Sequence, residues 1–322
     1  MSSKIYCGEY KDISCIILEN KKIKVKILPQ YGGKVQSIIN KVKQKEYLYQ
    51  TDKDKFKKAE YAMLFDNGDC SGFDDMFPTI DECYYPRKPW KGIKVPDHGE
   101  VWSLPWDYDL KEDSIFLSVH GMRFPYKLEK SIKIKNENCL HIDYRVKNYS
   151  AYDFDFIWAA HPLFNCSENT EIILPETVNK IINVYNNSKR LGKYGEIHSW
   201  PVTISDSGNK YDMSKMCSKS VKYCEKYYVQ DELKEGWASL YDNNNGDMIT
   251  LLYPIKKVPY LGIWVNKGGF MDQYNVALEP CTGAFDGVNM ANKWDRVSTI
   301  KANRNYKWFL DIKIDNQQKV NI

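Results

Sequence analysis

Two histidines lie in segments where an imidazole could transfer protons. The sequence PDHGEVWSLPW at residues 96–106 places His98 beside a glycine and close to two tryptophans. In the sequence WAAHPLFN at residues 158–165, His161 lies at the end of an apolar, strand-like run. Histidine is the side chain that gains and loses a proton most readily near neutral pH. Both residues are therefore candidates for acid–base chemistry.

One carboxylate also lies next to apolar residues in the sequence. Glu279 follows Val276, Ala277 and Leu278 directly and precedes a proline. Partial burial of a carboxyl group raises its pKa toward that of a working general base. Two imidazoles, one carboxylate and several tryptophan faces suit proton transfer on a neutral, hydroxyl-rich substrate, because aromatic faces bind the C–H side of a sugar.

Several other chemistries lack their usual signals. The chain has no GxSxG elbow, no GxxxxGK[ST] loop and no GxGxxG fingerprint, and no HExxH or similar cluster offers metal-ligand spacing. We therefore expect neither a metal nor a cofactor.

Alternating strands must hold these residues in place. Period-two alternation is clear at residues 23–27, 131–135 and 140–146, and residues 115–119 and 248–253 read as more deeply buried strands. Turn signals such as Gly32-Gly33 recur about every dozen residues, which favours an antiparallel sandwich over βαβ units. The best helix candidate is residues 52–65, whose lysine-rich run we interpret as a solvated helix face. The chain shows no linker or repeat, and we expect one all-β domain spanning residues 1–322.

The composition narrows the class of protein further. Of 322 residues, 43% are hydrophobic and 14% aromatic, which is enough to bury a full core. The net charge of +4 lacks the basic surplus of nucleic-acid-binding proteins, and no run is apolar for long enough to span a bilayer. The nine cysteines form no CxxC pair and the N-terminus has no apolar signal region. We expect a soluble, cytoplasmic protein that binds neither nucleic acid nor membranes.

The ordered set of motifs resembles the aldose 1-epimerase (galactose mutarotase-like) superfamily. The matching elements are His98-Gly99, His161 with Phe164-Asn165, Leu278-Glu279-Pro280, and Asp286 with Asn289. The sequence GFDDMFPTI at residues 72–80 is more similar to a divergent branch. The resemblance extends from about Ile23 to Ile314 and implies a large twisted antiparallel β-sandwich, the galactose mutarotase-like supersandwich, with a sugar cleft on a concave face.

The resemblance also implies a mechanism. Glu279 would take the proton from the anomeric hydroxyl while His161 protonates the ring oxygen, so that the ring opens and recloses as the other anomer. His98 would bind the substrate. We add Arg123, Asp75, Trp102, Trp158 and Trp264 as candidate sugar-binding residues.

The sequence departs from the family pattern at two places. The better-known members carry an Asn-Arg pair before the first histidine, where this chain has Asn67-Gly-Asp-Cys70. Their aspartate between the second histidine and the glutamate has no firm match, although Asp212 lies in that interval. A sugar-binding protein with a decayed catalytic set, or a lyase or hydrolase on the same fold, are therefore alternatives to an anomer-converting isomerase.

Some individual assignments stay open. His120 also precedes a glycine and competes with His98, whereas His141 and His198 read as structural or solvated. The tryptophans named above could be core residues, and Asp74, Asp75, Asp81 and Glu82 could form a solvated acidic loop. The chain has six arginines, all scattered, against 40 lysines. Because arginine is best shaped to hold a phosphate, this scatter predicts a neutral sugar rather than a sugar phosphate.

Overall fold

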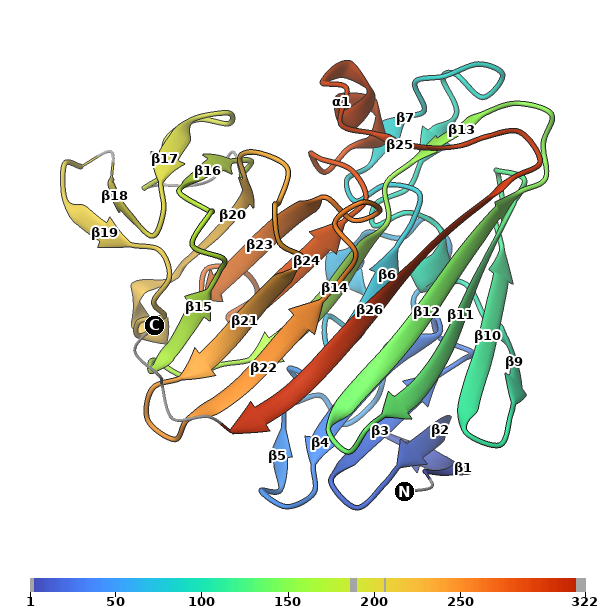
Figure 1. Ribbon diagram of the computed structural model, residues 1–322, viewed down its shortest axis with the longest axis horizontal. Helices are drawn as coiled ribbons and strands as arrows, with labels where there is room; N and C mark the ends of the chain where they lie inside the picture. The colour runs from blue at the N-terminus through green and yellow to red at the C-terminus, as the bar shows by residue number, and fades with distance from the viewer. Residues whose placement is uncertain (1–2, 186–189, 206, 317–322) are drawn as a thin grey trace.

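Two large antiparallel sheets packed face to face form the molecule (Figure 1), which is described from a computed structural model covering residues 3–185, 190–205 and 207–316. In spatial order, the 12-stranded sheet consists of β1 (Lys4–Tyr10), β2 (Ile13–Glu19), β3 (Ile23–Leu28), β4 (Lys34–Asn40), β6 (Phe73–Met76), β14 (Ala159–Asn165), β24 (Tyr274–Cys281), β23 (Tyr260–Lys267), β20 (Tyr223–Val229), β16 (Lys180–Asn183) and β17 (Ile197–Ser199), with β5 (Lys45–Glu46) paired to β4.

The second sheet covers one face of the first. In spatial order, its eight strands are β15 (Thr170–Ile173), β21 (Trp237–Asp242), β22 (Asp247–Leu252), β26 (Asn305–Asn316), β12 (Cys139–Asn148), β11 (Tyr126–Lys135), β10 (Ser114–His120) and β9 (Asp107–Leu110). One continuous apolar core that draws on both sheets fills the space between them. The predicted all-β antiparallel sandwich is confirmed, and the expected strands correspond to β3, β10, β11, β12 and β22.

Short pairs of strands and a few helical turns complete the described chain. The strand pairs are β7 (Cys83–Tyr84) with β8 (Lys94–Val95), β13 (Phe154–Phe156) with β25 (Ser298–Ile300), and β18 (Val202–Ile204) with β19 (Lys210–Asp212). The helical elements are α1 (Val288–Lys293) and the 3₁₀ turns η1 (Phe65–Asn67), η2 (Val101–Ser103) and η3 (Lys219–Val221). No helix within the described ranges is long and apolar enough to cross a membrane.

The expected helix at residues 52–65 is wrong. These residues form a loop that ends in the 3₁₀ turn η1. The Phe56 ring packs edge-on against Tyr31, with ring centroids 5.0 Å apart, so a tertiary contact holds the segment in a non-helical path. The run of lysines from Lys53 to Lys58 places like charges close together, which also disfavours a helix.

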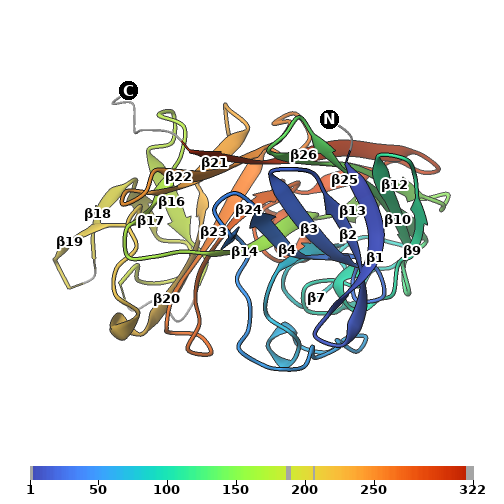
Figure 2. The same cartoon turned by 90° about the horizontal axis from the view of Figure 1, so that it is seen from below.

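Loops gather over the face of the 12-stranded sheet that points away from the second sheet. In Figure 2 the loops drawn in light blue to cyan lie on that side of the molecule, and β21, β22 and β26 lie on the other. As a result, every residue of β24 after Tyr274 is buried, although only one face of this strand packs into the core between the sheets. The covered outer face of β14, β24, β23 and β20 is where polar side chains collect.

Candidate active site

Strand register brings the predicted histidine and glutamate together. β14 pairs with β24 so that Ala159 stands opposite Cys281 and Leu163 opposite Ala277, and the same register sets His161 opposite Glu279. Directly opposed residues of an antiparallel pair project from the same face of the sheet. The two side chains therefore leave neighbouring strands on the loop-covered face.

The same face carries residues of the next two strands. Glu279 is also paired with Gly262 of β23, and Lys226 of β20 is paired with Trp264 of β23. A Cβ atom on Gly262 would lie 3.4 Å from Glu279 Oε2 and 3.2 Å from the Tyr228 ring. The glycine thus leaves room for the glutamate side chain to lie across β23 toward β20.

A cavity of about 560 Å³ opens above these strands. Its walls come from the central strands and from the loops above them. The lining residues are Leu64, Phe65, Asp66, Cys70, Ile80, Asp81, Glu82, Asp97, His98, His161, Leu163, Val184, Tyr185, Lys226, Trp264, Phe270, Gln273, Glu279 and Asp286. This is a concave site with several convergent polar groups, the usual form of a small-molecule binding site.

The centre of the cavity is a close histidine–carboxylate pair. His161 Nε2 lies 3.8 Å from Glu279 Oε1, and their side chains are 8% and 0% exposed. Within the described part of the chain, neither His161 Nδ1 nor Glu279 Oε1 has a hydrogen-bond partner. Burial raises the pKa of Glu279, and burial together with the nearby positive groups lowers the pKa of His161 well below its usual value. The two groups are close enough for one ligand to contact both.

Lys226 supplies the positive charge beside this pair. Its ammonium group lies 3.0 Å from Glu279 Oε2 and 3.1 Å from Asp286 Oδ1. Tyr228 donates a further hydrogen bond of 2.6 Å to Asp286 Oδ1. Burial alone would lower the pKa of Lys226, but Asp286, Glu279 and Asp81 raise it, so the side chain is a permanent cation.

A left-handed turn holds His98 at the cavity wall. His98 has φ +58° and is followed by Gly99 at φ +75°, where a Cβ atom would lie only 2.1 Å from the Phe77 carbonyl oxygen. The imidazole Nδ1 lies 2.9 Å from an Asp97 carboxylate oxygen, and the ring stacks on Phe65 with centroids 4.1 Å apart. Since Nδ1 is engaged by Asp97, Nε2 is the ring nitrogen left for a ligand. The His98 and His161 rings are 5.2 Å apart.

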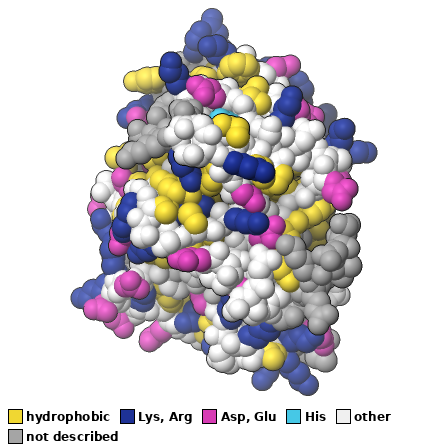
Figure 3. Space-filling view, turned by 90° about the vertical axis from the view of Figure 1, so that its left-hand side faces the viewer, with side chains coloured by type: hydrophobic (Ala, Val, Ile, Leu, Met, Phe, Trp, Pro, Cys, Tyr) yellow, Lys and Arg dark blue, Asp and Glu magenta, His cyan; other side chains and the backbone are white. Residues whose placement is uncertain are grey.

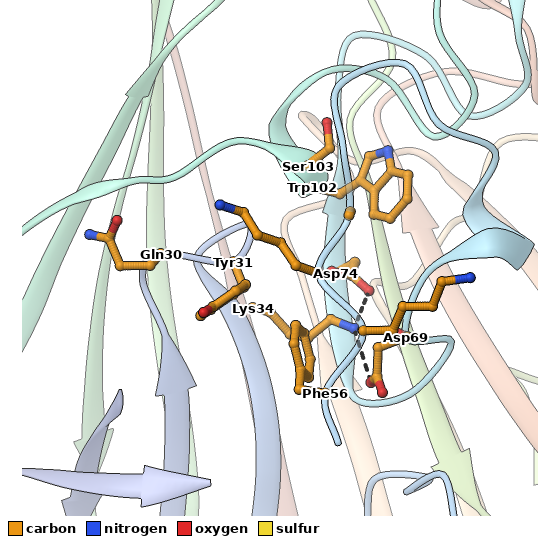
Figure 4. Close-up of a pocket in the computed structure, with 11 residues that line it drawn as sticks. Gln30, Tyr31, Lys34, Phe56, Asp69, Asp74, Trp102 and Ser103 are labelled. Carbon is orange, nitrogen blue, oxygen red and sulfur yellow. Dashed lines mark hydrogen bonds and ion pairs between the residues drawn. The ribbon is translucent and has the colours of Figure 1, made fainter. Parts of the chain in front are cut away.

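A second, much smaller cavity lies beside the first. Figure 4 shows Lys34 with its ammonium directed at Asp69 and Asp74, below Trp102. The Lys34–Asp74 distance is 3.0 Å and the cavity volume is only about 10 Å³, space for a single water molecule. Asp74 is the strand partner of His161. This buried ion pair therefore joins β4 to β6 beside the site and does not offer a second binding pocket.

Two of the predicted sugar-binding residues point away from the cavity, and their prediction is corrected here. Asp75 projects between the two sheets, where it pairs with Lys130 at 2.6 Å and accepts a 2.9 Å hydrogen bond from Trp158 Nε1. Trp158 is wholly buried in the same core. Because strand side chains alternate, Asp74 faces the site side while its neighbour Asp75 faces the core.

Arg123 and Trp102 lie close to the site without lining the main cavity. The Arg123 guanidinium donates a 2.7 Å hydrogen bond to the Lys94 carbonyl oxygen, and its backbone N–H donates to Glu100. Trp102 Nε1 donates to the Asp97 carbonyl oxygen at 3.0 Å, and its ring contacts Phe65. These two side chains brace the loop that carries His98 and do not reach a ligand directly. Trp264, in contrast, lines the cavity.

The choice between the two His-Gly dipeptides is decided by position. His98 lines the cavity, whereas His120 is exposed at the end of β10 in the other sheet. Asp212, which we considered for the missing family aspartate, accepts hydrogen bonds from Ser214 and lies outside the cavity. Among the residues of that interval that line the cavity, the charged one is Lys226. Sequence reasoning missed Lys226, although a lone basic residue next to Tyr227-Tyr228 in a mostly buried strand was a usable signal.

Metal binding has no support among the residues that the structure describes. In that part of the chain, no group of three or more histidine, cysteine, aspartate or glutamate side chains could hold an ion. All nine cysteines are free thiols.

Comparison with known families identifies the chain. The family model for aldose 1-epimerase matches residues 14–203, more than half of the sequence. The chain belongs to the aldose 1-epimerase family. A search of curated protein sequences finds no match.

Solved structures of other epimerase-like proteins share the fold. A galactose mutarotase-like protein from Clostridium acetobutylicum is 15% identical, with 98% of this chain and 99% of that chain covered and a TM-score of 0.68. A galactose mutarotase related enzyme from Lactobacillus acidophilus is 16% identical over 96% and 100% of the two chains, with a TM-score of 0.66. A galactose mutarotase-like protein from Lactobacillus casei is 20% identical over 94% and 100%, with a TM-score of 0.63. At such identities the likeness is one of fold.

Proposed function

We propose that this member of the aldose 1-epimerase family interconverts the anomers of a free sugar by acid–base catalysis. The supporting observation is the 3.8 Å separation of His161 Nε2 and Glu279 Oε1 at the centre of a cavity of about 560 Å³. The anomeric hydroxyl and the ring oxygen of a pyranose are bonded to the same carbon. A close acid–base pair can therefore contact both oxygens at once.

In the proposed mechanism, Glu279 takes the proton of the anomeric hydroxyl as that O–H electron pair forms the carbonyl bond. The bond between the anomeric carbon and the ring oxygen breaks, and the ring oxygen receives a proton from the imidazolium form of His161, which the lowered pKa of this residue makes a stronger acid. Rotation about the first carbon–carbon bond exposes the other face of the aldehyde. Reclosure reverses the two proton transfers, so that neither protons nor electrons are gained or lost overall.

The remaining site residues have supporting roles in this proposal. His98 presents Nε2 to the sugar because Asp97 and Phe65 fix its ring. Lys226 balances the charge of Glu279 from the far side. The site collects side chains from Leu64 to Asp286 along the sequence. We infer that residues 1–322 act as one carbohydrate-binding domain, because the site spans much of the sequence and both sheets share one apolar core.

Polarimetry on a freshly dissolved single anomer tests the proposal. We expect Glu279→Gln and His161→Asn each to lower the rate of anomer conversion by about 10²–10⁴-fold, the usual loss when general acid–base catalysis is removed. The matched control is Glu112→Gln, because Glu112 is exposed in the turn between β9 and β10 and lies outside the cavity.

The wild-type protein also distinguishes this proposal from its main alternative. A wild-type rate no faster than that of buffer would contradict the enzyme proposal. If such an inactive protein still bound sugars, as seen by quenching of tryptophan fluorescence, the sugar-binding alternative would take its place.

A further inference from the structure

The cavity carries more acidic side chains than basic ones. Six carboxylates line it, and Lys226 is the one lysine or arginine among the described lining residues. Four of the six have a basic partner, namely Glu279 and Asp286 with Lys226, Asp97 with His98, and Glu82 with Lys94. Asp66 and Asp81 form no ion pair with any residue that the structure describes. The cavity therefore keeps negative charge that the protein does not balance.

Asp81 lies directly beside Asp286 at the cavity wall. Its backbone N–H donates a 3.0 Å hydrogen bond to the Asp286 carbonyl oxygen, and its side chain is exposed to the cavity. Lys226 and Tyr228 both contact Asp286 at Oδ1, which leaves Oδ2 available to a ligand. The surrounding protein and the negative charge of Asp286 raise the pKa of Asp81 to about 6. A cation placed between the two carboxylates would relieve this repulsion.

The polar groups of the cavity follow one another in a closed ring. In order of contact, they are His161, Glu279, Lys226, Asp286, Asp81 and His98. Ile80 makes the step from Asp81 to His98, because its carbonyl oxygen accepts a 2.6 Å hydrogen bond from the His98 N–H. A sugar held at His161 and Glu279 would therefore have the two aspartates beyond Glu279, on the side away from His161.

Glu279 independently indicates a ligand that donates hydrogen bonds. Its side chain is fully buried and lines the cavity, and its Oε1 accepts no hydrogen bond from the described part of the chain. A buried acceptor that lacks a donor is costly, so a bound hydroxyl or ammonium group would stabilise it.

The proposed mechanism fixes which carbon of the sugar faces the two aspartates. The anomeric hydroxyl lies at Glu279 and the ring oxygen at His161, so the second carbon lies on the Glu279 side of the ring. Its substituent faces Asp286 and Asp81. A hydroxyl group there could donate one hydrogen bond, whereas an ammonium group donates up to three and supplies the missing positive charge. Hydrogen bonds between ionised partners are about twice as strong as neutral ones.

We propose that Asp81 and Asp286 bind the ammonium group of a 2-amino sugar, which makes hexosamines the preferred substrate class. This assignment rests on the proposed anomer conversion and names its substrate. Asp81 determines specificity in this proposal and takes no part in the proton transfers, which remain with His161 and Glu279.

Initial rates on single anomers of glucosamine, glucose and N-acetylglucosamine test the proposal. Assays at about pH 6.5 keep glucosamine protonated, since an α-amino group has a pKa of about 7.7 or more. We expect glucosamine to have a higher kcat/KM than either neutral sugar. In Asp81→Asn, the ratio of the glucosamine value to the glucose value should fall by about tenfold, as expected when a hydrogen bond to a charged group is weakened. A wild-type value for glucosamine no higher than that for glucose would overturn the proposal.

Asp66→Asn is the matched control. It removes the other carboxylate that has no ion pair, at a different part of the cavity lining next to Phe65. Its glucosamine-to-glucose ratio should stay close to that of the wild type. An equal fall in Asp66→Asn and Asp81→Asn would show a general attraction of cations by the acidic cavity and would contradict a site at Asp81 and Asp286.

Binding of methyl glycosides separates this proposal from the proposed activity. The methyl glycosides of glucosamine and glucose cannot undergo anomer conversion, so calorimetry measures their affinity even if the protein proves inactive. Tighter binding of the amino glycoside that is lost in Asp81→Asn would support the ammonium site. Equal or weaker binding of the amino glycoside by the wild-type protein would overturn it.

Discussion

The Lys226 ammonium group lies 3.0 Å from Glu279 Oε2, on the side of the carboxylate away from His161. The glutamate side chain is 0% exposed, and a carboxylate taken out of water without a partner would be protonated at neutral pH. Lys226 provides that partner and is itself held by Asp286, which Tyr228 also contacts. Lys226 therefore opposes the rise in pKa that burial imposes on Glu279.

Removing Lys226 is expected to shift the pH dependence of the reaction. The charged and titratable groups around Glu279 are Lys226, His161, His98, Asp286, Asp81 and Tyr228. Without the lysine, burial and the negative charge of Asp286 would raise the pKa of Glu279 further. In Lys226→Met, the acidic limb of the pH–rate profile should therefore move to higher pH by about 1–3 units.

Two further variants check that this shift comes from the positive charge. Lys226→Arg restores the charge and should move the limb back toward the wild-type pH. Lys222→Met removes an exposed lysine that pairs with Asp272 outside the cavity, so its profile should match that of the wild type. A Lys226→Met profile with an unchanged limb, or one shifted to lower pH, would show that Lys226 does not control the charge of Glu279.

The Asp97–His98 pair is expected to link stability to pH. Burial would raise the pKa of Asp97, but its hydrogen bond and charge attraction with His98, the Phe65 backbone N–H and the charge of Lys226 together lower it. A carboxyl group with a lowered pKa in the folded state stabilises the fold above its unfolded pKa of about 3.9, and this contribution disappears as the pH falls through the folded value. Asp97→Asn should therefore lower the free energy of unfolding at pH 7, and this difference from wild type should shrink below about pH 4. Urea unfolding at both pH values measures it, and a difference independent of pH would contradict the prediction.

Most of the fold could be predicted because its strands show their pattern locally. β12 alternates buried and exposed residues along its length, as expected for a strand with one solvated face. The failed helix at residues 52–65 depended on a contact that local sequence does not contain. Phe56 is anchored by Tyr31 and Tyr10, residues that are brought to it by the turn between β3 and β4 and by the hairpin of β1 and β2. Propensity alone could not predict that long-range packing.

The site was only partly predictable for a similar reason. His161, Glu279 and His98 lie in distinctive short motifs. Strand register brings the first two together, and a turn places His98 beside them. The role of Asp75 depended on which of two adjacent aspartates faces the core, and the short strand β6 gives no apolar alternation to show it. Lys226 could be assigned only after the order of β24, β23 and β20 in the sheet was known.

Asp75 is expected to contribute to stability and not to sugar contact. It forms a 2.6 Å ion pair with Lys130, and both side chains are almost fully buried at 0% and 1% exposure. Removing one partner of a buried ion pair leaves the other charge uncompensated, which costs about 3–5 kcal/mol. Asp75→Asn should therefore lower the free energy of unfolding by several kcal/mol while the folded fraction keeps its kcat/KM. Denaturant unfolding measures the stability, and kinetics per folded molecule measure kcat/KM. A variant with normal stability but a raised KM would show instead that Asp75 contacts the sugar.

The charge of the cavity leads to a prediction about the substrate's charge. Asp66, Asp81, Glu82, Asp97, Glu279 and Asp286 line it, against Lys226 as the one lysine or arginine in the lining. On the side of the molecule shown in Figure 3, the described lysine and arginine side chains are scattered among acidic ones. Arg123, a candidate sugar-binding residue, is engaged with the Lys94 carbonyl group outside the cavity.

We therefore expect a higher kcat/KM for glucose than for glucose 6-phosphate. Repulsion between the phosphate and the cavity carboxylates acts over a distance set by salt, with a screening length of about 30 Å at ~0.01 M and about 3 Å at ~1 M. Raising the ionic strength should therefore increase the value for the phosphate and leave that for glucose nearly unchanged. Parallel assays of the two sugars at several salt concentrations measure both effects. A phosphate that is the better substrate at low salt, and loses that advantage in Lys226→Met, would show instead that Lys226 binds the anion.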